Sequence, residues 1–137
     1  PRSTLFPYTT LFRSGPPGIG CPVIAALTGA ALVVAVTEPT PSGEHDLLRV
    51  LELAAHFGLP CALWVNRWDL NPELGAAIER RAAERGARPV GRIPIDPAVT
   101  AAQLEGRPLV EAGGGPAARA IRDGWTRLER LIEEAPG

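Results

Sequence analysis

Three short apolar runs, each followed by a loop and a helix-like pattern, constrain the fold of this chain more than any other feature. The runs cover residues 31–37, 61–65 and 89–95. The segments with helical periodicity cover residues 42–56, 71–86 and 97–104. Strands that alternate with helices form parallel sheets, so this order predicts an α/β fold with right-handed crossovers and flanking helices. The first run, ALVVAVT, is continuous and β-branched, which predicts burial on both faces.

Residues typical of helix starts support this division. Asn71 is predicted to cap a helix that has Pro72 at its first position. Asp96 is predicted to cap the helix at 97–104, and Ser42 the helix that ends near residue 56. Each predicted helix therefore begins just after a loop that follows a strand.

The C-terminal part of the chain has a different character. Residues 106–111, GRPLVE, are predicted to be a short extended segment. Residues 117–135 show the periodicity of an amphipathic helix, and their apolar stripe is expected to pack on the core.

The composition excludes several classes of protein. The 137 residues are about one domain's worth, and the net charge near −1 gives no excess of positive charge for binding nucleic acid. The 14 basic residues are all arginine, which excludes a Schiff-base lysine and a complete P-loop within this chain. Two cysteines can form neither a disulfide scaffold nor a four-thiolate metal site.

The first fourteen residues, PRSTLFPYTTLFRS, do not match the rest in composition. They contain the one tyrosine and two of the three phenylalanines, whereas the following residues are rich in Ala, Gly and Arg. The string is similar to the translation of a sequencing adapter, so we interpret residues 1–14 as a non-native scar and the natural domain as N-terminally truncated. The alternative is a hydrophobic β-hairpin arm.

Residues 15–37 carry no charge, but prolines and glycines interrupt them. A transmembrane helix is one interpretation of this length. The breakers favour a loop, a short helix at 22–28 and the first strand instead. With no signal peptide visible, we expect a cytoplasmic protein with reduced thiols and no integral membrane segment.

Four irregular loops are predicted to meet at one edge of the sheet, because ligands of open α/β sheets bind at the carboxyl ends of the strands. The loops are GPPGIG at 15–20, EPTPSG at 38–43, NRWDLN at 66–71 and IPIDP at 93–97. Their convergence is the main evidence in the sequence for a binding site.

The NRWD segment suggests purine recognition. Asn66 follows a buried strand and can present one donor and one acceptor to a purine edge. Asp69, three residues later, could accept two N–H groups from guanine. The alternative is structural, with an Asx turn and a loop that starts a helix.

The GPPGIG loop lacks the Gly-Lys-Ser/Thr sequence of a Walker A loop and the pattern of a dinucleotide fingerprint. Its turn could fix backbone amides near a phosphate. The alternative is a tight turn before a helix.

Taken together, four segments resemble the C-terminal half of the MinD/ParA/Mrp group of deviant P-loop ATPases. They are GPPGIGCPVIAALTGA, VTEPTPSGEHDLLRVLELAAHFGLP, WVNRWDLNPEL and GRIPIDPAVTAAQLEGRPLVE, in family-like order. The sequence is most similar to MinD-like ATPases that carry an inserted ferredoxin-like domain. The resemblance implies a three-layer, SIMIBI-like P-loop NTPase fold, with residues 15–112 as the C-terminal half of the domain and 113–137 as a C-terminal helix.

The resemblance also implies roles for individual residues. The switch-like turn beside the γ-phosphate matches Gly15, Pro16, Pro17 and Gly18. Asn66 matches the asparagine that contacts adenine, and Arg67 stands where the family usually has Lys or Arg. The base pocket is lined by backbone at the positions of Pro94, Ile95 and Asp96, and residues 38–43 match a loop near the dimer interface. The family favours ATP over GTP, which leaves Asp69 to cap or brace the loop.

The departures from the family pattern limit what this chain can do. Ser14 occupies the position of an Mg²⁺-associated aspartate, and the Walker A lysines would lie upstream. The resemblance implies that the parent protein hydrolyses ATP with Mg²⁺. Because phosphoryl transfer depends on the charges that are missing here, we expect this chain to be inactive. The expected partners are a nucleotide and a second copy in a homodimer; [4Fe-4S] clusters belong to the inserted domain that the resemblance implies.

Two other classes of function stay open. One is a non-catalytic α/β binding module, and the other is a GTPase fragment that reads guanine through NRWD. Cys61, at the start of a strand, is expected to be a core residue, whereas Cys21 is either a small buried residue or a redox-active thiol.

Overall fold

The structure of the protein is a computed structural model that describes residues 21–135. Its elements, in chain order, alternate between helix and strand up to the third strand and then continue as helices. The predictions for residues 1–14 and for the turn at 15–18 fall outside the described residues.

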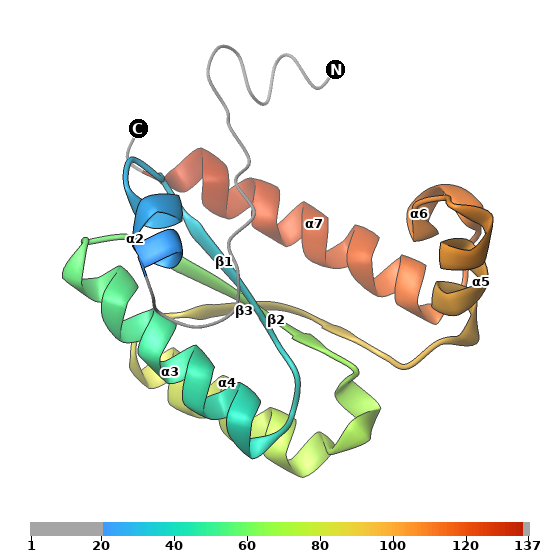
Figure 1. Ribbon diagram of the computed structural model, residues 1–137, viewed down its shortest axis with the longest axis horizontal. Helices are drawn as coiled ribbons and strands as arrows, with labels where there is room; N and C mark the ends of the chain where they lie inside the picture. The colour runs from blue at the N-terminus through green and yellow to red at the C-terminus, as the bar shows by residue number, and fades with distance from the viewer. Residues whose placement is uncertain (1–20, 136–137) are drawn as a thin grey trace.

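A three-stranded parallel sheet forms the centre of the molecule (Figure 1). Its strands lie in the order β1 (Val33–Thr37), β2 (Cys61–Asn66) and β3 (Arg88–Ile93). In the register, Val33 is paired with Cys61 and Asn66 with Ile93, so the three carboxyl ends lie at one edge. The predicted α/β fold with a parallel sheet and flanking helices is confirmed.

Helices cover the two faces of this sheet unequally. Helices α3 (Pro41–His56) and α4 (Pro72–Glu84) lie on one face, and α7 (Pro116–Glu134) lies across the other, which gives three layers (Figure 1). Helix α7 contacts β3 and β2. The amphipathic pattern of α7 is therefore a core-packing pattern, because Leu128 is buried and Trp125 packs beside it.

The face under α3 and α4 holds the larger apolar core. Side chains from both helices meet the inward residues of β1 and β2 there, and Leu63, Val65 and Ile78 are almost fully buried. Cys61 belongs to this core, as predicted, and burial raises the pKa of its thiol to about 11. A thiol with a raised pKa is a weak nucleophile at neutral pH, so Cys61 acts as a small apolar residue.

On the α7 face, Trp64 sets how closely the layers approach. A Cβ added at Gly124 of α7 would lie 2.4 Å from the Trp64 ring, and one added at Gly91 would lie 2.5 Å from its Nε1. The indole therefore occupies the space that two side chains would need. Its Nε1 is buried among the described residues without a hydrogen-bond partner, which is the cost of placing the ring there.

The run at 31–37 is not buried on both faces, contrary to the prediction. Among the described residues, Val34 is 41% exposed and Val36 is 61% exposed, both on the face where α7 packs mainly on β3 and also contacts β2. Alternate residues Val33 and Thr37 face the core under α3 and are buried.

Three helices, α3, α4 and α5, begin with a residue whose side chain caps the helix, followed by proline. Asn71 accepts a hydrogen bond from Leu74 N in front of α4, as predicted. At α3 the cap is Thr40, whose Oγ1 accepts from Gly43 N, and Ser42 lies inside the helix. The prediction of Ser42 was wrong because Pro41 occupies the first helical position, where proline is favoured, so the residue before it is the cap.

The remaining elements are short. Helix α2 (Cys21–Leu27) precedes β1, and a 3-10 turn η1 (Trp68–Leu70) precedes α4. Helix α5 (Pro97–Glu105) follows β3, and α6 (Leu109–Ala112) follows α5. The segment predicted to be extended at 106–111 is thus partly helical, because Pro108 starts a turn that the Glu111 and Ala112 amides close by donating to its carbonyl. Within the described part of the chain, no helix has the length and apolar character needed to cross a bilayer.

Candidate functional site

The carboxyl edge of the sheet brings together three of the four predicted loops. The chain leaves β1 at Glu38, β2 at Arg67 and β3 at Pro94, and the register places these exits side by side. The loops at 38–43, 66–71 and 93–97 therefore meet at one edge, as predicted. The fourth, at 15–20, lies outside the described residues, as do its predicted site residues Gly15, Pro16, Pro17 and Gly18.

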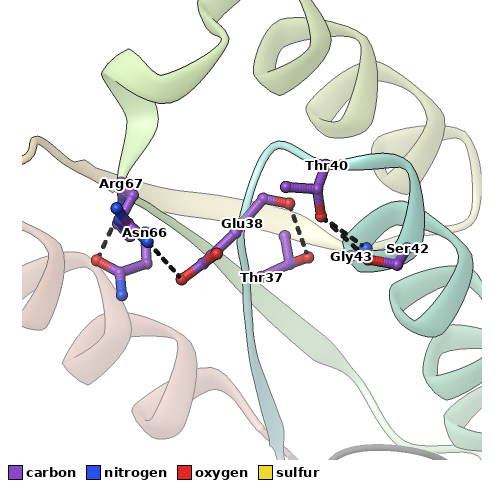
Figure 2. Close-up of polar contacts among 7 residues, drawn as sticks. All are labelled: Thr37, Glu38, Thr40, Ser42, Gly43, Asn66 and Arg67. Carbon is purple, nitrogen blue, oxygen red and sulfur yellow. Dashed lines mark hydrogen bonds and ion pairs between the residues drawn. The ribbon is translucent and has the colours of Figure 1, made fainter.

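Asn66 is the last residue of β2 and is half-buried. Its Oδ1 accepts a hydrogen bond from the backbone N–H of Arg67 at 3.0 Å, while its amide nitrogen points away from Arg67 and Glu38 (Figure 2). An amide oxygen has two lone pairs and the NH₂ group has two protons. Asn66 thus keeps one acceptor site and two donors for a ligand at this edge.

Arg67 takes a left-handed backbone conformation, with φ +52°. It is the one non-glycine residue with positive φ between residues 21 and 135. This region is disfavoured for side-chain-bearing residues and persists where surrounding contacts fix it. The Asn66 hydrogen bond and a bond from Leu70 N to the Arg67 carbonyl at 2.9 Å supply two such contacts.

The Arg67 side chain reaches toward the end of β1. Its guanidinium lies 4.0 Å from a carboxylate oxygen of Glu38, and the two side chains are 52% and 43% exposed (Figure 2). On the other side of Glu38, Gly43 packs so closely that a Cβ would lie 2.5 Å from the Glu38 carbonyl oxygen. The loop at 38–43 is thereby folded back onto the start of α3.

Asp69 ties the loop after β2 to the loop after β3. Its Oδ1 accepts a hydrogen bond from the backbone N–H of Ile95 at 2.8 Å, across 26 residues of sequence. The prediction that Asp69 braces its loop is confirmed by this contact. Of the two carboxylate oxygens that guanine recognition would use, Oδ1 already accepts one hydrogen bond from the protein.

A contact between Trp68 and Arg92 links the loop after β2 to strand β3 itself. The Arg92 guanidinium lies 3.8 Å from the Trp68 ring centroid and forms a bidentate ion pair with Glu79, with N–O distances of 2.7 and 3.2 Å. The pKa of Arg92 is raised, chiefly by the hydrogen bonds that its guanidinium donates to the Glu79 carboxylate. Trp68 in turn packs on α4, where a Cβ at Gly75 would lie 2.6 Å from its ring.

Asp96 joins two helix starts. Its Oδ1 accepts from Ala98 N of α5 at 2.9 Å, and its Oδ2 accepts from Ala117 N of α7 at 3.1 Å. These two backbone hydrogen bonds, in that order, hold the pKa of Asp96 below its ordinary value. The predicted cap is confirmed, and the second cap fixes the start of α7 against the loop after β3.

Sequence reasoning missed the three residues Trp68, Glu79 and Arg92. Arg92 and Glu79 are 13 residues apart, on a strand and on a helix, so no local spacing brings them together. The one available signal was the aromatic residue inside the polar NRWD segment, which needs an apolar or cationic neighbour.

The described residues offer no metal centre. No group of three or more His, Cys, Asp or Glu side chains among residues 21–135 is placed to hold an ion. An Mg²⁺ ion needs oxygen ligands in a near-octahedral arrangement, and a [4Fe-4S] cluster needs four thiolates where the chain has two cysteines. The residues present therefore fit neither group.

Two open cavities lie away from this edge. One, of about 400 Å³, is lined by α3 residues and Arg85; the other, of about 180 Å³, lies between β3 and α7 beside Arg127. Neither contains Asn66, Arg67 or Pro94–Asp96.

Comparisons with known proteins identify the fold. No protein-family model matches the chain. An uncharacterised protein of Methanocaldococcus jannaschii, MJ0578, is 35% identical over 57 residues, which is 42% of this chain and 21% of that protein. MinD in the MinC:MinD cell division protein complex of Aquifex aeolicus is 28% identical with a TM-score of 0.67, over 81% of this chain and 48% of that one.

A third match is the septum site-determining protein MinD from Pyrococcus horikoshii, whose structure is a complex with Mg-ADP. It has a TM-score of 0.72 and 22% identity over 85% of this chain and 49% of that one. The chain has the α/β fold of MinD-type P-loop NTPases. It spans about half the length of these solved structures and about a fifth of the uncharacterised relative.

Proposed function

We propose that this chain is the base-binding half of an ATP-binding, MinD-like P-loop ATPase domain. The observation that carries the proposal is the pairing of two loops at the carboxyl edge, one that presents the Asn66 amide and one that runs through Pro94–Asp96, tied by Asp69. Ligands of open α/β sheets bind at this edge. The Mg-ADP complex of the Pyrococcus horikoshii MinD supports a nucleotide as the ligand.

Adenine fits these residues better than guanine. An asparagine amide can bind adenine in a bidentate manner, donating to one ring nitrogen and accepting from the exocyclic amine. Guanine recognition through Asp69 needs both carboxylate oxygens for two N–H groups, and Oδ1 would have to serve the base while it also accepts from Ile95. The half-buried Asn66 side chain and the backbone after β3 would therefore hold the adenine ring.

The chemistry of phosphoryl transfer is assigned to residues that this chain does not contain. Lysine is absent, and the described residues hold no metal-ligand cluster. Catalysis of this class depends on charge neutralisation by Lys and Mg²⁺. The side chains at the carboxyl edge would bind and orient the base and would not activate water.

The test is isothermal titration of this chain with ATP, ADP and GTP at millimolar nucleotide, with a phosphate-release assay alongside. We expect weak binding of ATP and ADP, weaker binding of GTP, and no release of phosphate above background. Asn66→Ala should abolish the preference for adenine. Phosphate release with Mg-ATP would defeat the assignment of an inactive half-domain.

The same titration separates the alternatives. A preference for GTP would favour a GTPase fragment that uses Asp69. No binding of any nucleotide would favour a non-catalytic α/β module.

Four narrower assignments extend the proposal to the parent protein. We assign to it Mg²⁺-dependent ATP hydrolysis, a homodimer and a cytoplasmic location. An inserted ferredoxin-like domain would supply its own cysteines for iron–sulfur clusters, because the two cysteines of this chain are too few. Electronic absorption of the purified full-length protein near 400 nm tests the last assignment.

A further inference from the structure

We infer that Asp69 is a positioning residue: its hydrogen bond to the Ile95 amide fixes the spacing between the Asn66 loop and the Pro94–Asp96 loop, and so sets nucleotide affinity. The inference rests on the proposed function, because it concerns the same site. It differs from that proposal in naming a side chain that never touches the base.

Asp69 has no local structural duty that would explain its contact. The cap of α4 is Asn71, which accepts from Leu74 N, and the left-handed turn at Arg67 is held by Asn66. The Asp69 side chain is instead turned to a segment 26 residues further along the chain. An exposed carboxylate that bonds a distant backbone amide at 2.8 Å contributes a tertiary contact between two loops.

The Asp69–Ile95 hydrogen bond joins the loops after β2 and β3, whose separation would set the width of the proposed base site. Asn66 is paired with Ile93 in the sheet, so the loops after β2 and β3 begin side by side at this last pair. Past this point the ladder no longer sets the distance between them. The Asp69–Ile95 bond is the next link beyond the last strand pair, and it limits how far the loops can separate.

The Trp68–Arg92 stack holds the same loop from its other side. Arg92 belongs to β3 and is oriented by Glu79 of α4, so the indole of Trp68 lies between a fixed guanidinium and the α4 backbone at Gly75. Because Trp68 and Asp69 are consecutive, the stack restricts where the Asp69 carboxylate can lie. The bond to Ile95 therefore forms between parts that are already ordered, which lowers the entropy cost of making it.

A matched pair of variants tests the inference. Asp69→Asn keeps an oxygen that accepts from the Ile95 amide, whereas Asp69→Ala removes it. We expect Asp69→Ala to weaken ATP binding by about tenfold, the effect of losing one hydrogen bond to a charged group. Asp69→Asn should bind ATP within about twofold of the natural chain. Asp123→Ala, on an exposed position of α7, is the control for removal of a carboxylate.

A second measurement does not need nucleotide. Amide hydrogen exchange at Ile95 should accelerate in Asp69→Ala and stay slow in Asp69→Asn, with unchanged exchange in the core strand β2. A faster exchange throughout the sheet would show general unfolding and overturn a positioning role.

The outcomes separate this inference from the proposed function. If the natural chain binds ATP and Asp69→Ala binds equally well, the positioning role is wrong while the function stands. If both variants lose binding alike, Asp69 acts through its charge on the ligand and the inference is wrong. If the natural chain binds no nucleotide, the proposed function falls and this inference falls with it.

Discussion

The two outer strands of the sheet, β1 and β3, differ in how far helices cover their faces. Strand β3 is packed by α4 on one face and by α7 on the other, whereas the helix that mainly contacts β1 among the described residues is α3. The same residue type shows the difference: Val90 of β3 is 2% exposed and Val36 of β1 is 61% exposed. Neighbouring layers, and not residue type, decide what a valine contributes.

The free edges of the two strands differ as well. Strand β3 contains Pro89, and its pairing with β2 shifts register between Leu63 and Trp64. Proline and an irregular register both discourage a further strand from pairing. Strand β1, VVAVT, has neither proline nor charge and runs regularly against β2. Among residues 21–135, the β3 edge of the sheet therefore carries features that discourage a further strand, and the β1 edge does not.

The largest effect should follow from filling the space between α7 and the β3 side of the sheet. Gly124→Val places a side chain against the Trp64 ring, where a Cβ alone would lie 2.4 Å away. We expect a loss of about 3 kcal/mol or more in the free energy of unfolding, measured in urea. Gly114→Val is the control, since nothing lies within 4 Å of a Cβ there. Equal losses in both variants would contradict the packing described for Trp64.

A milder test truncates one valine on each outer strand. Val90→Ala should cost about 2 kcal/mol, because it removes buried apolar surface and leaves a cavity. Val36→Ala should cost less than about 0.5 kcal/mol, because its side chain is already largely in water. If both losses are the same, the two strands are covered alike and the contrast between them fails.

The β3 side should also lose stability in acid through Asp96. Asp96 holds the starts of α5 and α7, and its pKa is lowered in the folded chain. A lowered pKa means that the stabilisation is complete above the ordinary value of 3.8 and is lost as the pH falls through the folded-state value.

Asp96→Asn cannot titrate, and its single amide oxygen can accept at only one of the two helix starts. Urea unfolding between pH 6 and pH 2 should therefore show a smaller loss of stability in Asp96→Asn than in the natural chain. Parallel curves for the two proteins would show that Asp96 does not couple folding to pH.

The smallest effect is expected at the β1 end of the carboxyl edge. Glu38→Gln removes the charge that lies 4.0 Å from the Arg67 guanidinium, in a pair with both side chains about half exposed. We expect a change of less than about 0.5 kcal/mol, reduced further in 0.5 M salt. A loss above 1 kcal/mol would mean that the loop after β1 is held more firmly than its contacts indicate.

Most of the fold could be predicted from local sequence patterns. The alternation of runs gave the parallel sheet, and a capping residue before proline gave the starts of α4 and α5 at Asn71 and Asp96. The same rule would have placed the α3 cap at Thr40 had Pro41 been weighed above Ser42. Such signals depend on neighbours within four residues, which the sequence shows directly.

The rest depends on contacts between distant segments. No spacing in the chain reveals that Asp69 bonds Ile95, or that Arg92 stacks on Trp68 while paired with Glu79. The exposure of Val34 and Val36 follows from where α7 crosses the sheet, which the strand's own residues do not encode. The sequence thus indicated Asn66, Pro94, Ile95 and Asp96 as site residues, and the structure adds the side chains that hold their loops together.

The central claim is that the carboxyl edge of this sheet binds a purine, and mapping ATP on the backbone amides of the chain by two-dimensional NMR tests it most directly. The account predicts that the largest chemical-shift changes fall on Asn66, Arg67 and Ile95, with the α3 residues around the 400 Å³ cavity unaffected. Changes that gather instead at His45, Arg49 and Arg85, or the absence of any change at millimolar ATP, would contradict it.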